Sequence, residues 1–534
     1  MKKYIAIIAA LFALASCNEW LDGTENNDYL TDELVWRTEE SAELYVNGFY
    51  TYLDKYGQFG TYQFGGSMTE SLTDVFKYGS KSLGHKAGHP NNYVCHPEAI
   101  TTAGCLWGIW GTAYGNIRRI NGFLESMEKF SKLPEAKNTE LAAQARFFRA
   151  YVYFQLAKRH PKGVILYDRL PVGNDKALSS AADTWQFIYD DLKFAAEHLP
   201  AEWPSADRGR VTKYAAYAMM SRAMLYAGRW EDVIAAADSV IASNKFGLMD
   251  KYADSWKGGN KESILEFRYS VSGPNHSFDE DYDPLYEYGG LGTPTQEMVE
   301  TYFKADGTEF DWTPWHNGTA TSRPLYEALE PRFQATIIYN GCDWKGKTMD
   351  CKVGGSNGPF VDYFSVDYSY GMTTTGYFLR KMVDENHTDL RGVQSAQTWV
   401  EIRYAEVLLN KAEAMYRFGS PAAQYQAPVN EIRSRAGLGK VNLTGDAWWQ
   451  AYRRERKIEL AYEGHYFWDL RRWEVAHTEL SNYRVHGMKI TGTNFEYVTC
   501  DVEDRLFYSK LYCLPIPDDE LKDNTLAEQY DEWK

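Results

Sequence analysis

Apart from one segment near its start, the sequence lacks a long apolar run. Lys2 and Lys3 precede an unbroken apolar stretch of eleven residues, Ile5–Ala15. A transmembrane helix needs about 20 apolar residues, so this stretch is too short to cross a bilayer. A basic start, a short apolar stretch and small residues before a cleavage point are typical of an export signal. We therefore expect an exported chain that is soluble apart from any tether at its new amino terminus.

The end of this signal indicates such a tether. The small residues LAS stand directly before Cys17, which resembles a bacterial lipobox, where the cysteine becomes the acylated first residue. Acyl burial contributes roughly 0.8 kcal/mol per CH₂, and two or more chains give stable anchoring; the alternative is an ordinary signal with a chance cysteine. We predict that residues 1–16 form a lipoprotein signal peptide and residues 17–534 one domain. By resemblance to Gram-negative lipoproteins, the acidic residues after Cys17 indicate display on the outer-membrane surface.

Basic residues are few relative to acidic ones. The chain has 57 Lys and Arg against 73 Asp and Glu, which gives a formal net charge of −16. Nucleic-acid binding is dominated by neutralisation of phosphates, so this balance argues against a nucleic-acid partner. It also argues against polyanionic ligands, unless a local basic patch exists.

Motifs for nucleophilic or metal chemistry are not conspicuous. No Ser/His/Asp constellation can be assembled from spacing, and no Cys-x-x-Cys pair occurs. His85, His89, Cys95, His96 and Cys105 leave structural zinc as an alternative, because such sites use nitrogen and sulfur ligands. Disulfides persist in exported proteins, and the six cysteines after Cys17 fall into close pairs: Cys95 with Cys105, Cys342 with Cys351, and Cys500 with Cys513. We favour disulfide-braced loops over zinc, and we expect no cofactor.

One motif would indicate a nucleotide hydrolase. The run GCDWKGKT at residues 341–348 satisfies G-x-x-x-x-G-K-[ST]. A phosphate-binding loop also needs a helix N-terminus aimed at the phosphates, whereas the glycine-rich MDCKVGGSNGPF follows Thr348. We therefore expect a surface hairpin bridged from Cys342 to Cys351, with Trp344 near its tip as packing or as an aromatic face.

A regular sequence repeat is absent, yet helical hairpins recur. Residues 210–242 predict two helices that break near Gly228, and residues 401–437 predict two more with breaks at Gly419 and Gly437. Small residues in these segments allow close helix approach, as in tetratricopeptide-type pairs. Further helices are predicted over residues 107–130, 139–159, 184–199 and 446–463. The sequence thus predicts a mostly α fold, with a hairpin scaffold over about residues 30–57, 107–250 and 401–475.

Loop-rich segments separate the helical parts. Residues of about 58–106, 251–400 and 481–514 are rich in glycine, tyrosine, asparagine and proline, and long stretches of this kind tend to be functional. Their aromatic rings offer flat faces on which the C–H faces of sugars can stack, although core packing is the competing interpretation. The candidate ligand-binding residues are Tyr78, Tyr282, Tyr286, Tyr288, Trp312, Trp315, Asn317 and Arg323, with Tyr363, Tyr368 and Tyr370 as weaker candidates.

A charged helix near the C-terminus needs an explanation of its own. Glu455, Glu459 and Glu463 lie four residues apart, so they share one face of the predicted helix. Two such carboxylates resemble the acid/base pair of a glycosidase, but carboxylates between arginines stay ionised and salt-bridged. We expect a structural clamp with the nearby Arg453, Arg454, Arg456, Arg471 and Arg472, and with Asp469.

The last third of the chain carries a family resemblance. The segments EIRYAEVLLNKAEAMYRFG, VNEIRSRAGL, RRERKIELAYEGHYFWDLRRW and LYCLPIPDDEL resemble the C-terminal half of the SusD/RagB family. Residues 107–126 and 289–307 are also similar to that family, so the resemblance covers nearly the whole mature chain. It implies tetratricopeptide-like hairpins that support an irregular binding face, without catalysis.

The same resemblance implies a function. Members of the family are surface lipoproteins that bind glycans and lid a SusC-like TonB-dependent transporter in the outer membrane. Two alternatives remain open at this point: a member that binds peptides, favouring cationic ones because of the acidic balance, and a surface glycoside hydrolase.

Overall fold

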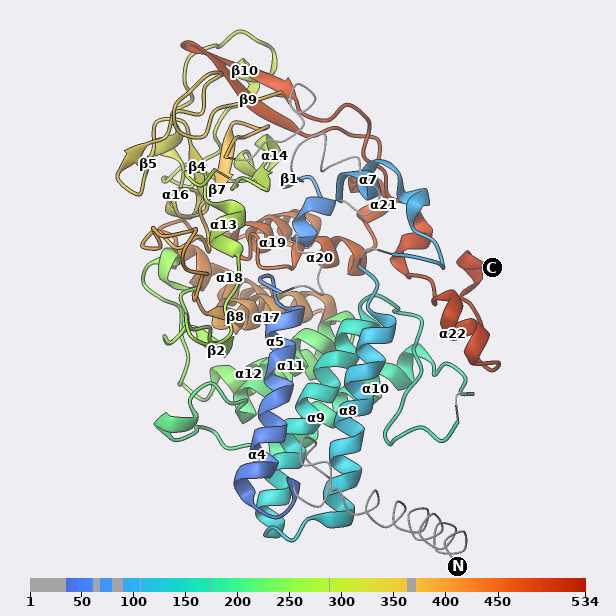
Figure 1. Ribbon diagram of the computed structural model, residues 1–534. Helices are drawn as coiled ribbons and strands as arrows, with labels where there is room; N and C mark the ends of the chain where they lie inside the picture. Colours follow the sequence, from blue (N-terminus) through green and yellow to red (C-terminus); the bar gives the residue numbers. More distant parts are fainter. Residues whose placement is uncertain are drawn as a thin grey trace, which may run out of the picture.

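The computed structural model describes residues 35–60, 68–78, 90–105, 107–173, 175–287, 289–362 and 371–534. Most long helices lie in the lower half of the molecule as drawn in Figure 1, and most of the short strands and their connecting loops lie in the upper half. None of the helices in these ranges is both long enough and apolar enough to cross a bilayer. The predicted signal peptide and Cys17 lie outside the described residues.

The lower half is a stack of helices that follow one another in the chain. Each long helix packs against the next one, in the order α8 (Trp110–Phe130), α9 (Glu135–Ala157), α10 (Ala181–His198), α11 (Lys213–Tyr226), α12 (Trp230–Ile241), α17 (Tyr404–Phe418) and α18 (Ala422–Arg435). The short helices α4 (Glu39–Asn47) and α5 (Thr51–Tyr56) cover α9, and α19 (Gly445–Glu459) contacts α17 and α18. The predicted mostly α scaffold is therefore confirmed.

Local sequence explains where these helices begin and end. The side chain of Ser180 caps α10 by accepting a hydrogen bond from the Asp183 N–H at 3.0 Å, and Thr212 caps α11 in the same way. Gly419 ends α17 with a φ of 81°, a left-handed conformation that glycine adopts without a Cβ clash. Buried alanines such as Ala223 and Ala412 let neighbouring helices approach closely. These are the breaks and small residues that the sequence indicated.

Strands and short helices make up the rest. Within the described residues the strands form five two-stranded antiparallel sheets: β1 (Phe76–Tyr78) with β3 (Gly292–Pro294), β2 (Ser263–Phe267) with β8 (Trp399–Arg403), β4 (Ile337–Tyr339) with β7 (Tyr377–Leu379), β5 (Asp343–Trp344) with β6 (Lys347–Thr348), and β9 (His486–Thr491) with β10 (Asn494–Thr499). The shorter helices are α7 (Pro90–Cys95), α13 (Phe278–Tyr282), α14 (Gln296–Val299), α15 (Thr313–His316), α16 (Pro331–Thr336), α20 (Tyr466–Arg472), α21 (Ala476–Glu479) and α22 (Asp518–Asp523).

Several helix boundaries differ from those predicted; α8 begins at Trp110 rather than at residue 107, and α9 begins at Glu135 rather than at residue 139. The helix expected from Glu401 begins only at Tyr404, because the three residues before it belong to the fully buried strand β8, which pairs with β2. Its β-branched and aromatic side chains favour a buried strand. The helix expected to reach Glu463 ends at Glu459, the last residue of α19.

Residues 341–348 form a hairpin and not a phosphate-binding loop. Lys345 and Gly346, between β5 and β6, have φ values of 50° and 73°, as a two-residue type I′ turn requires. Residues 349–362 contain no helix, so no helix N-terminus is present to bind a phosphate. Trp344 is fully buried, and its indole N–H donates to an Asp283 carboxylate oxygen at 3.2 Å. Its role is therefore packing.

The six cysteines after Cys17 are free thiols, so the structure contains none of the three disulfides expected from spacing. Beside the hairpin, the Cys342 sulfur accepts a hydrogen bond from the Tyr339 backbone N–H at 3.4 Å. Burial raises the pKa of the Cys95 and Cys105 thiols to about 11. Thiols in this state stay protonated at neutral pH and are poor nucleophiles.

A buried set of ion pairs connects the two halves of the molecule. Glu459 at the end of α19 is fully buried and accepts hydrogen bonds from Arg332 of α16 at 3.2 Å and Arg403 of β8 at 2.7 Å. Glu455 pairs with Arg332 and Arg433, and Glu463 pairs with Arg403 and Lys381. The predicted structural clamp is present, but its basic partners come mainly from distant segments.

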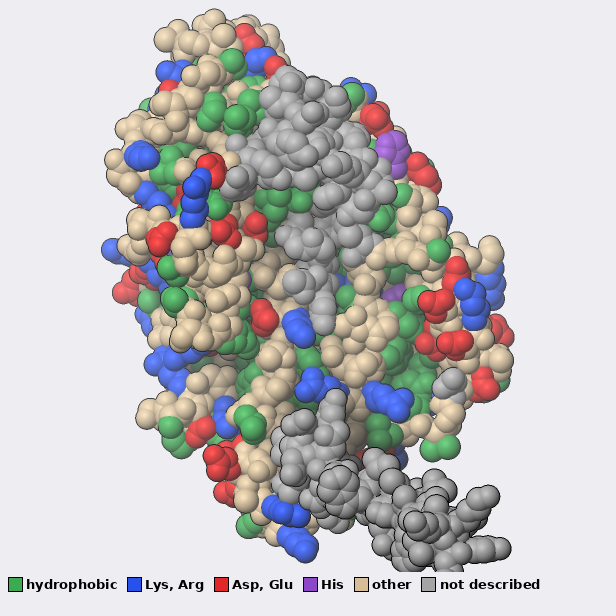
Figure 2. Space-filling view, in the orientation of Figure 1, with side chains coloured by type: hydrophobic (Ala, Val, Ile, Leu, Met, Phe, Trp, Pro, Cys, Tyr) green, Lys and Arg blue, Asp and Glu red, His purple; other side chains and the backbone are tan. Residues whose placement is uncertain are grey.

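The neighbouring arginines that the sequence offered have other partners. Arg456 and Arg472 both pair with Asp469, as expected. Arg453 pairs with Glu479, and Arg454 pairs with Glu309. Figure 2 shows blue and red side chains interspersed over the described part of this face, with no continuous basic band.

Candidate functional site

Three of the predicted aromatic residues belong to the core. Tyr78 is 7% exposed, Tyr282 is 2% exposed and Trp312 is 5% exposed. Tyr282 packs against the rings of Phe76 and Phe278, with centroids at 6.1 and 4.6 Å. Covered rings of this kind stabilise the fold and present no face for a ligand to stack on. Core packing therefore accounts for these three side chains.

Four other tyrosine candidates lie outside the described residues, and the side chains of Tyr286 and Arg323 bond to neighbouring carboxylates. Tyr288, Tyr363, Tyr368 and Tyr370 lie outside the described residues. Tyr286 is half-buried, and its hydroxyl donates to Glu280 at 3.4 Å. Arg323 forms a two-pronged ion pair with Glu327 at 2.6 and 3.0 Å. Its guanidinium lies over the Tyr326 ring at 5.4 Å, so the side chain is already engaged.

Trp315 and Asn317 remain as accessible candidates, and both lie at the short helix α15. Trp315 is half-buried, and its indole N–H donates to the Ser322 carbonyl at 2.8 Å, which fixes the orientation of the ring. Phe310 lies beside it, with ring centroids 6.0 Å apart. Asn317 is exposed, and its side-chain oxygen accepts from the Thr319 N–H and hydroxyl, which orders the turn after the helix.

A second aromatic group continues this surface. The ring of Tyr497 on β10 stacks on the imidazole of His486 of β9 and lies beside the tilted imidazole of His316 of α15, with centroids 4.4 Å away in each case. The Phe495 N–H donates to the Thr321 carbonyl at 2.8 Å and ties the β9–β10 hairpin to the α15 segment. We call Phe310, Trp315, His316, Tyr497 and His486 the aromatic ridge. Its hairpin lies at the top of the molecule in Figure 1.

Carboxylates hold the two imidazoles of the ridge in place. A Glu300 carboxylate oxygen lies 2.7 Å from His316 Nε2, and a Glu297 oxygen lies 2.6 Å from His486 Nδ1. Burial raises the pKa of Glu300. Burial, followed by the charges of Glu297 and Glu300, also raises the pKa of Tyr497, so its hydroxyl stays protonated at neutral pH. The ridge thus combines ring faces with hydrogen-bonding groups along their edge.

Tyr497 and His486 were not among the predicted site residues. The alternation of side chains along a strand could have indicated these two residues. In the β9–β10 register Tyr497 pairs with Met488, so the side chains of Tyr497 and Met488 lie on the same face of the hairpin as that of His486, the diagonal neighbour of Tyr497. The residues further along that face, Ile490 and Phe495, are buried. Tyr497 therefore lies where the buried face of the hairpin meets the surface, which the segment NFEYVT could have indicated.

A polar groove in the same half of the molecule offers amides instead of rings. Two adjoining cavities of about 430 and 490 Å³ share Lys257, Asp384, Asn386 and Gln397. Trp256 in its wall is 8% exposed, so no exposed indole, phenol or phenyl ring occurs among the described lining residues. The aromatic ridge is therefore the better platform for stacking.

Neither metal nor glycosidase chemistry gains support from the described residues. His96 pairs with Glu98 at 3.3 Å and Glu503 at 3.1 Å, while His85 and His89 lie outside the described ranges. Within those ranges no group of three His, Cys, Asp or Glu is placed to hold a metal ion. Glu455 and Glu459 are at most 1% exposed and ion-paired, which keeps them from a substrate.

Comparisons with known proteins agree with this architecture. The model of the SusD family matches residues 245–533, and a family described as starch-binding and associating with the outer membrane matches residues 19–225. A SusD-like protein from Bacteroides fragilis is 27% identical, with a TM-score of 0.78 over 94% of this chain and 98% of that chain.

Two other relatives extend the similarity. A SusD-like carbohydrate-binding protein from Bacteroides fragilis is 25% identical, with a TM-score of 0.77 over 92% of this chain and all of that chain. SusD-like protein P2 from Formosa agariphila is 23% identical over 98% of both chains. Because the SusD model covers more than half of the sequence, the protein belongs to the SusD family of non-catalytic, outer-membrane-associated binding proteins.

Proposed function

We propose that this protein is a cell-surface lipoprotein that captures oligo- or polysaccharide and delivers it to a partner SusC-like TonB-dependent transporter. The observation that carries the proposal is the aromatic ridge, in which Trp315 and Tyr497 are held in fixed orientations by Ser322 and by two imidazoles. A sugar would stack its C–H faces on these rings, and its hydroxyls would bond to Asn317, Glu297 and Glu300. The relative described as a carbohydrate-binding protein supports the same ligand class.

Affinity electrophoresis against a panel of polysaccharides tests ligand capture. We expect at least one polysaccharide to retard the protein, and both Trp315→Ala and Tyr497→Ala to weaken that retardation about 10-fold, the effect of losing roughly 1.4 kcal/mol. Trp230→Ala is the matched control, because Trp230 is also a half-buried indole at the edge of a core cluster but lies on the scaffold helix α12. Retardation that both ridge variants leave unchanged would refute this site.

The panel also separates the alternatives. A peptide-binding member would bind cationic peptides and ignore every glycan, consistent with the net charge of −16. Release of reducing sugar from a bound glycan at high protein concentration would indicate a hydrolase and contradict a role without catalysis.

The anchor has a separate test. We propose that acylation of Cys17 tethers the protein to the outer membrane, since two or more acyl chains give stable attachment. Cys17→Ala in the producing cell should move the protein from the outer-membrane fraction to a soluble fraction and abolish fatty-acid labelling. A Cys17→Ala protein that stays with the outer membrane would contradict a lipid tether at this residue.

A further inference from the structure

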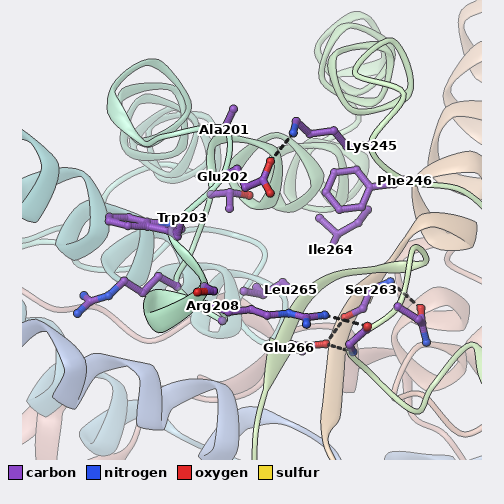
Figure 3. A pocket seen from close by; sticks show the side chains of 16 residues that line it. Ala201, Glu202, Trp203, Arg208, Lys245, Phe246, Ser263, Ile264, Leu265 and Glu266 are labelled. Atoms are coloured by element: carbon purple, nitrogen blue, oxygen red, sulfur yellow. Dashed lines mark hydrogen bonds and ion pairs between the residues drawn. The ribbon is translucent and has the colours of Figure 1, made fainter.

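A further cavity lies where the helical scaffold meets the loop-rich half. It has a volume of about 530 Å³ and is formed by residues 201–212, which follow α10, and by residues 245–266, which lead into β2. Figure 3 shows Trp203 on one side and Phe246 on the other, with Ile264 and Leu265 between them. Ligand pockets typically have about 300–1,000 Å³ and mostly apolar walls. We call this cavity the scaffold pocket.

The two aromatic walls of the scaffold pocket are fixed in orientation. Trp203 is half-buried, and its indole N–H donates to the Val211 carbonyl at 2.8 Å. Phe246 is half-buried and meets the ring of Tyr214 edge-on at 5.9 Å. The Arg210 guanidinium lies over the Trp203 ring, 5.6 Å from its centroid. Because both rings are already held in place, a ligand that stacks on their remaining faces causes little loss of side-chain entropy.

Most charges around the scaffold pocket are already neutralised. Lys245 pairs with Glu202 at 2.7 Å on the upper rim in Figure 3. On the opposite rim Glu266 accepts hydrogen bonds from the Gly259 N–H, the Ser263 hydroxyl and Arg268, at 2.7, 2.6 and 2.8 Å. These groups leave hydrogen-bonding capacity at the rim but little net charge.

Arg208 is different from the other basic residues at this pocket. It is exposed, and its Nη2 donates to the Gly259 carbonyl at 2.8 Å, which holds the guanidinium at the rim. Arg210 pairs with Asp207 and Arg268 pairs with Glu266, whereas no carboxylate among the described residues forms an ion pair with Arg208. On a chain with a net charge of −16, this leaves a local positive charge beside two ring faces.

We propose that the scaffold pocket is a second carbohydrate site, selective for a sugar unit that bears a carboxylate, a hexuronate. The C–H face of the sugar ring lies on Trp203, the carboxylate pairs with the remaining N–H groups of Arg208, and hydroxyls bond to Glu202 and Ser263. Arginine is suited to this role because its planar fork matches a carboxylate and its charge is weakly hydrated. The inference rests on the proposed function, since it assumes that the protein's ligands are glycans.

Calorimetric titration with trigalacturonate and with its fully methyl-esterified form tests the assignment, because esterification removes the charge on the carboxyl groups. The wild-type protein should bind the acid about 10-fold more tightly than the ester, and Arg208→Gln should remove that difference. Arg119→Gln is the matched control, because Arg119 is an exposed arginine on α8, and it should bind like the wild type. Trp203→Leu should weaken binding of both probes.

The outcomes separate this inference from the proposed function. Equal affinity of the wild type for acid and ester, or unchanged selectivity in Arg208→Gln, would overturn the scaffold pocket as a uronate site. If Trp315→Ala rather than Arg208→Gln abolished binding of the acid, the ligand would bind the aromatic ridge, and only the inference would fail. Absence of binding to every glycan, neutral or acidic, would overturn both.

Discussion

At the scale of single residues, buried carboxylates depend on buried arginines. Glu413 of α17 is fully buried and accepts hydrogen bonds from Arg472 at 2.6 and 2.7 Å, from the Trp473 indole at 2.9 Å and from the Tyr452 hydroxyl at 2.9 Å. Burial alone would raise its pKa, but the Arg472 guanidinium and these donors lower the pKa to about 2. The carboxylate is thus ionised at neutral pH.

This pKa predicts how stability depends on pH. Because the folded pKa of Glu413 is lower than the unfolded value of 4.5, the unfolded chain binds more protons as the pH falls from about 4.5 to 2. The stabilisation, on the order of 3 kcal/mol, is therefore present above pH 4.5 and lost progressively below it. Chemical denaturation at about pH 7 and about pH 3 should show a smaller loss for Glu413→Gln, which lacks this titration, than for the wild type. An equal loss in both would contradict the prediction.

Replacement by alanine should reduce stability by different amounts at two tryptophans, because their side chains differ in exposure. Trp344→Ala should destabilise the protein by about 3–5 kcal/mol, because it removes a fully buried ring from the core. Trp315→Ala should cost less stability, because Trp315 is half-buried. Urea unfolding followed by circular dichroism measures both, and a Trp344→Ala protein as stable as the wild type would rule out its packing role.

The residue scale is also where prediction from the sequence is weakest. Tyr282 and Trp312 lie in segments whose composition is typical of a binding loop, yet both side chains are buried in the structure. Sequence context cannot tell a ring that closes a core from one at its edge, because burial there depends on segments far away in the chain. Tyr282, for example, packs against Phe76 of β1, with ring centroids 6.1 Å apart.

At the scale of helices and strands, sequence patterns predict far more. The breaks at Gly228 and Gly419 and the buried alanines act within one or two helical turns, so the positions of α11, α12, α17 and α18 follow from local sequence. The pairing of strand β8 cannot be detected in the same way, because it joins Ser263 of β2 to Arg403, far apart in the chain. The local sequence of a short strand does not identify a partner that is distant in the chain.

The end of α17 gives a direct test of this local logic. Gly419 has a φ of 81°, and the space where a Cβ would stand is open, so Gly419→Ala should cost about 1–2 kcal/mol through left-handed strain alone. Gly115, inside α8, has the same open space but ordinary helical φ, so Gly115→Ala should stabilise by about 0.5–1 kcal/mol. Thermal unfolding measures both; stabilisation by Gly419→Ala would contradict the assigned cap.

At the scale of the whole molecule, the ion pairs of Glu459 join the scaffold to the loop-rich half. Its partners Arg332 and Arg403 come from α16 and β8, which are distant from α19 in the sequence. Removing one member of such a buried set leaves an unpaired charge and costs about 3–5 kcal/mol. The loop-rich half is therefore joined to the scaffold by a network that only the complete fold assembles, which explains why no local motif predicted the arginine partners of Glu459.

The account depends most on the claim that the aromatic ridge binds glycan. Isothermal titration of the best-binding polysaccharide into the wild type, the Trp315→Ala/Tyr497→Ala double variant and the Trp230→Ala control tests it directly. We expect the double variant to bind about 100-fold more weakly, roughly 2.7 kcal/mol, while retaining its circular dichroism spectrum, and the control to bind like the wild type. A folded double variant that binds as tightly as the wild type would contradict the account.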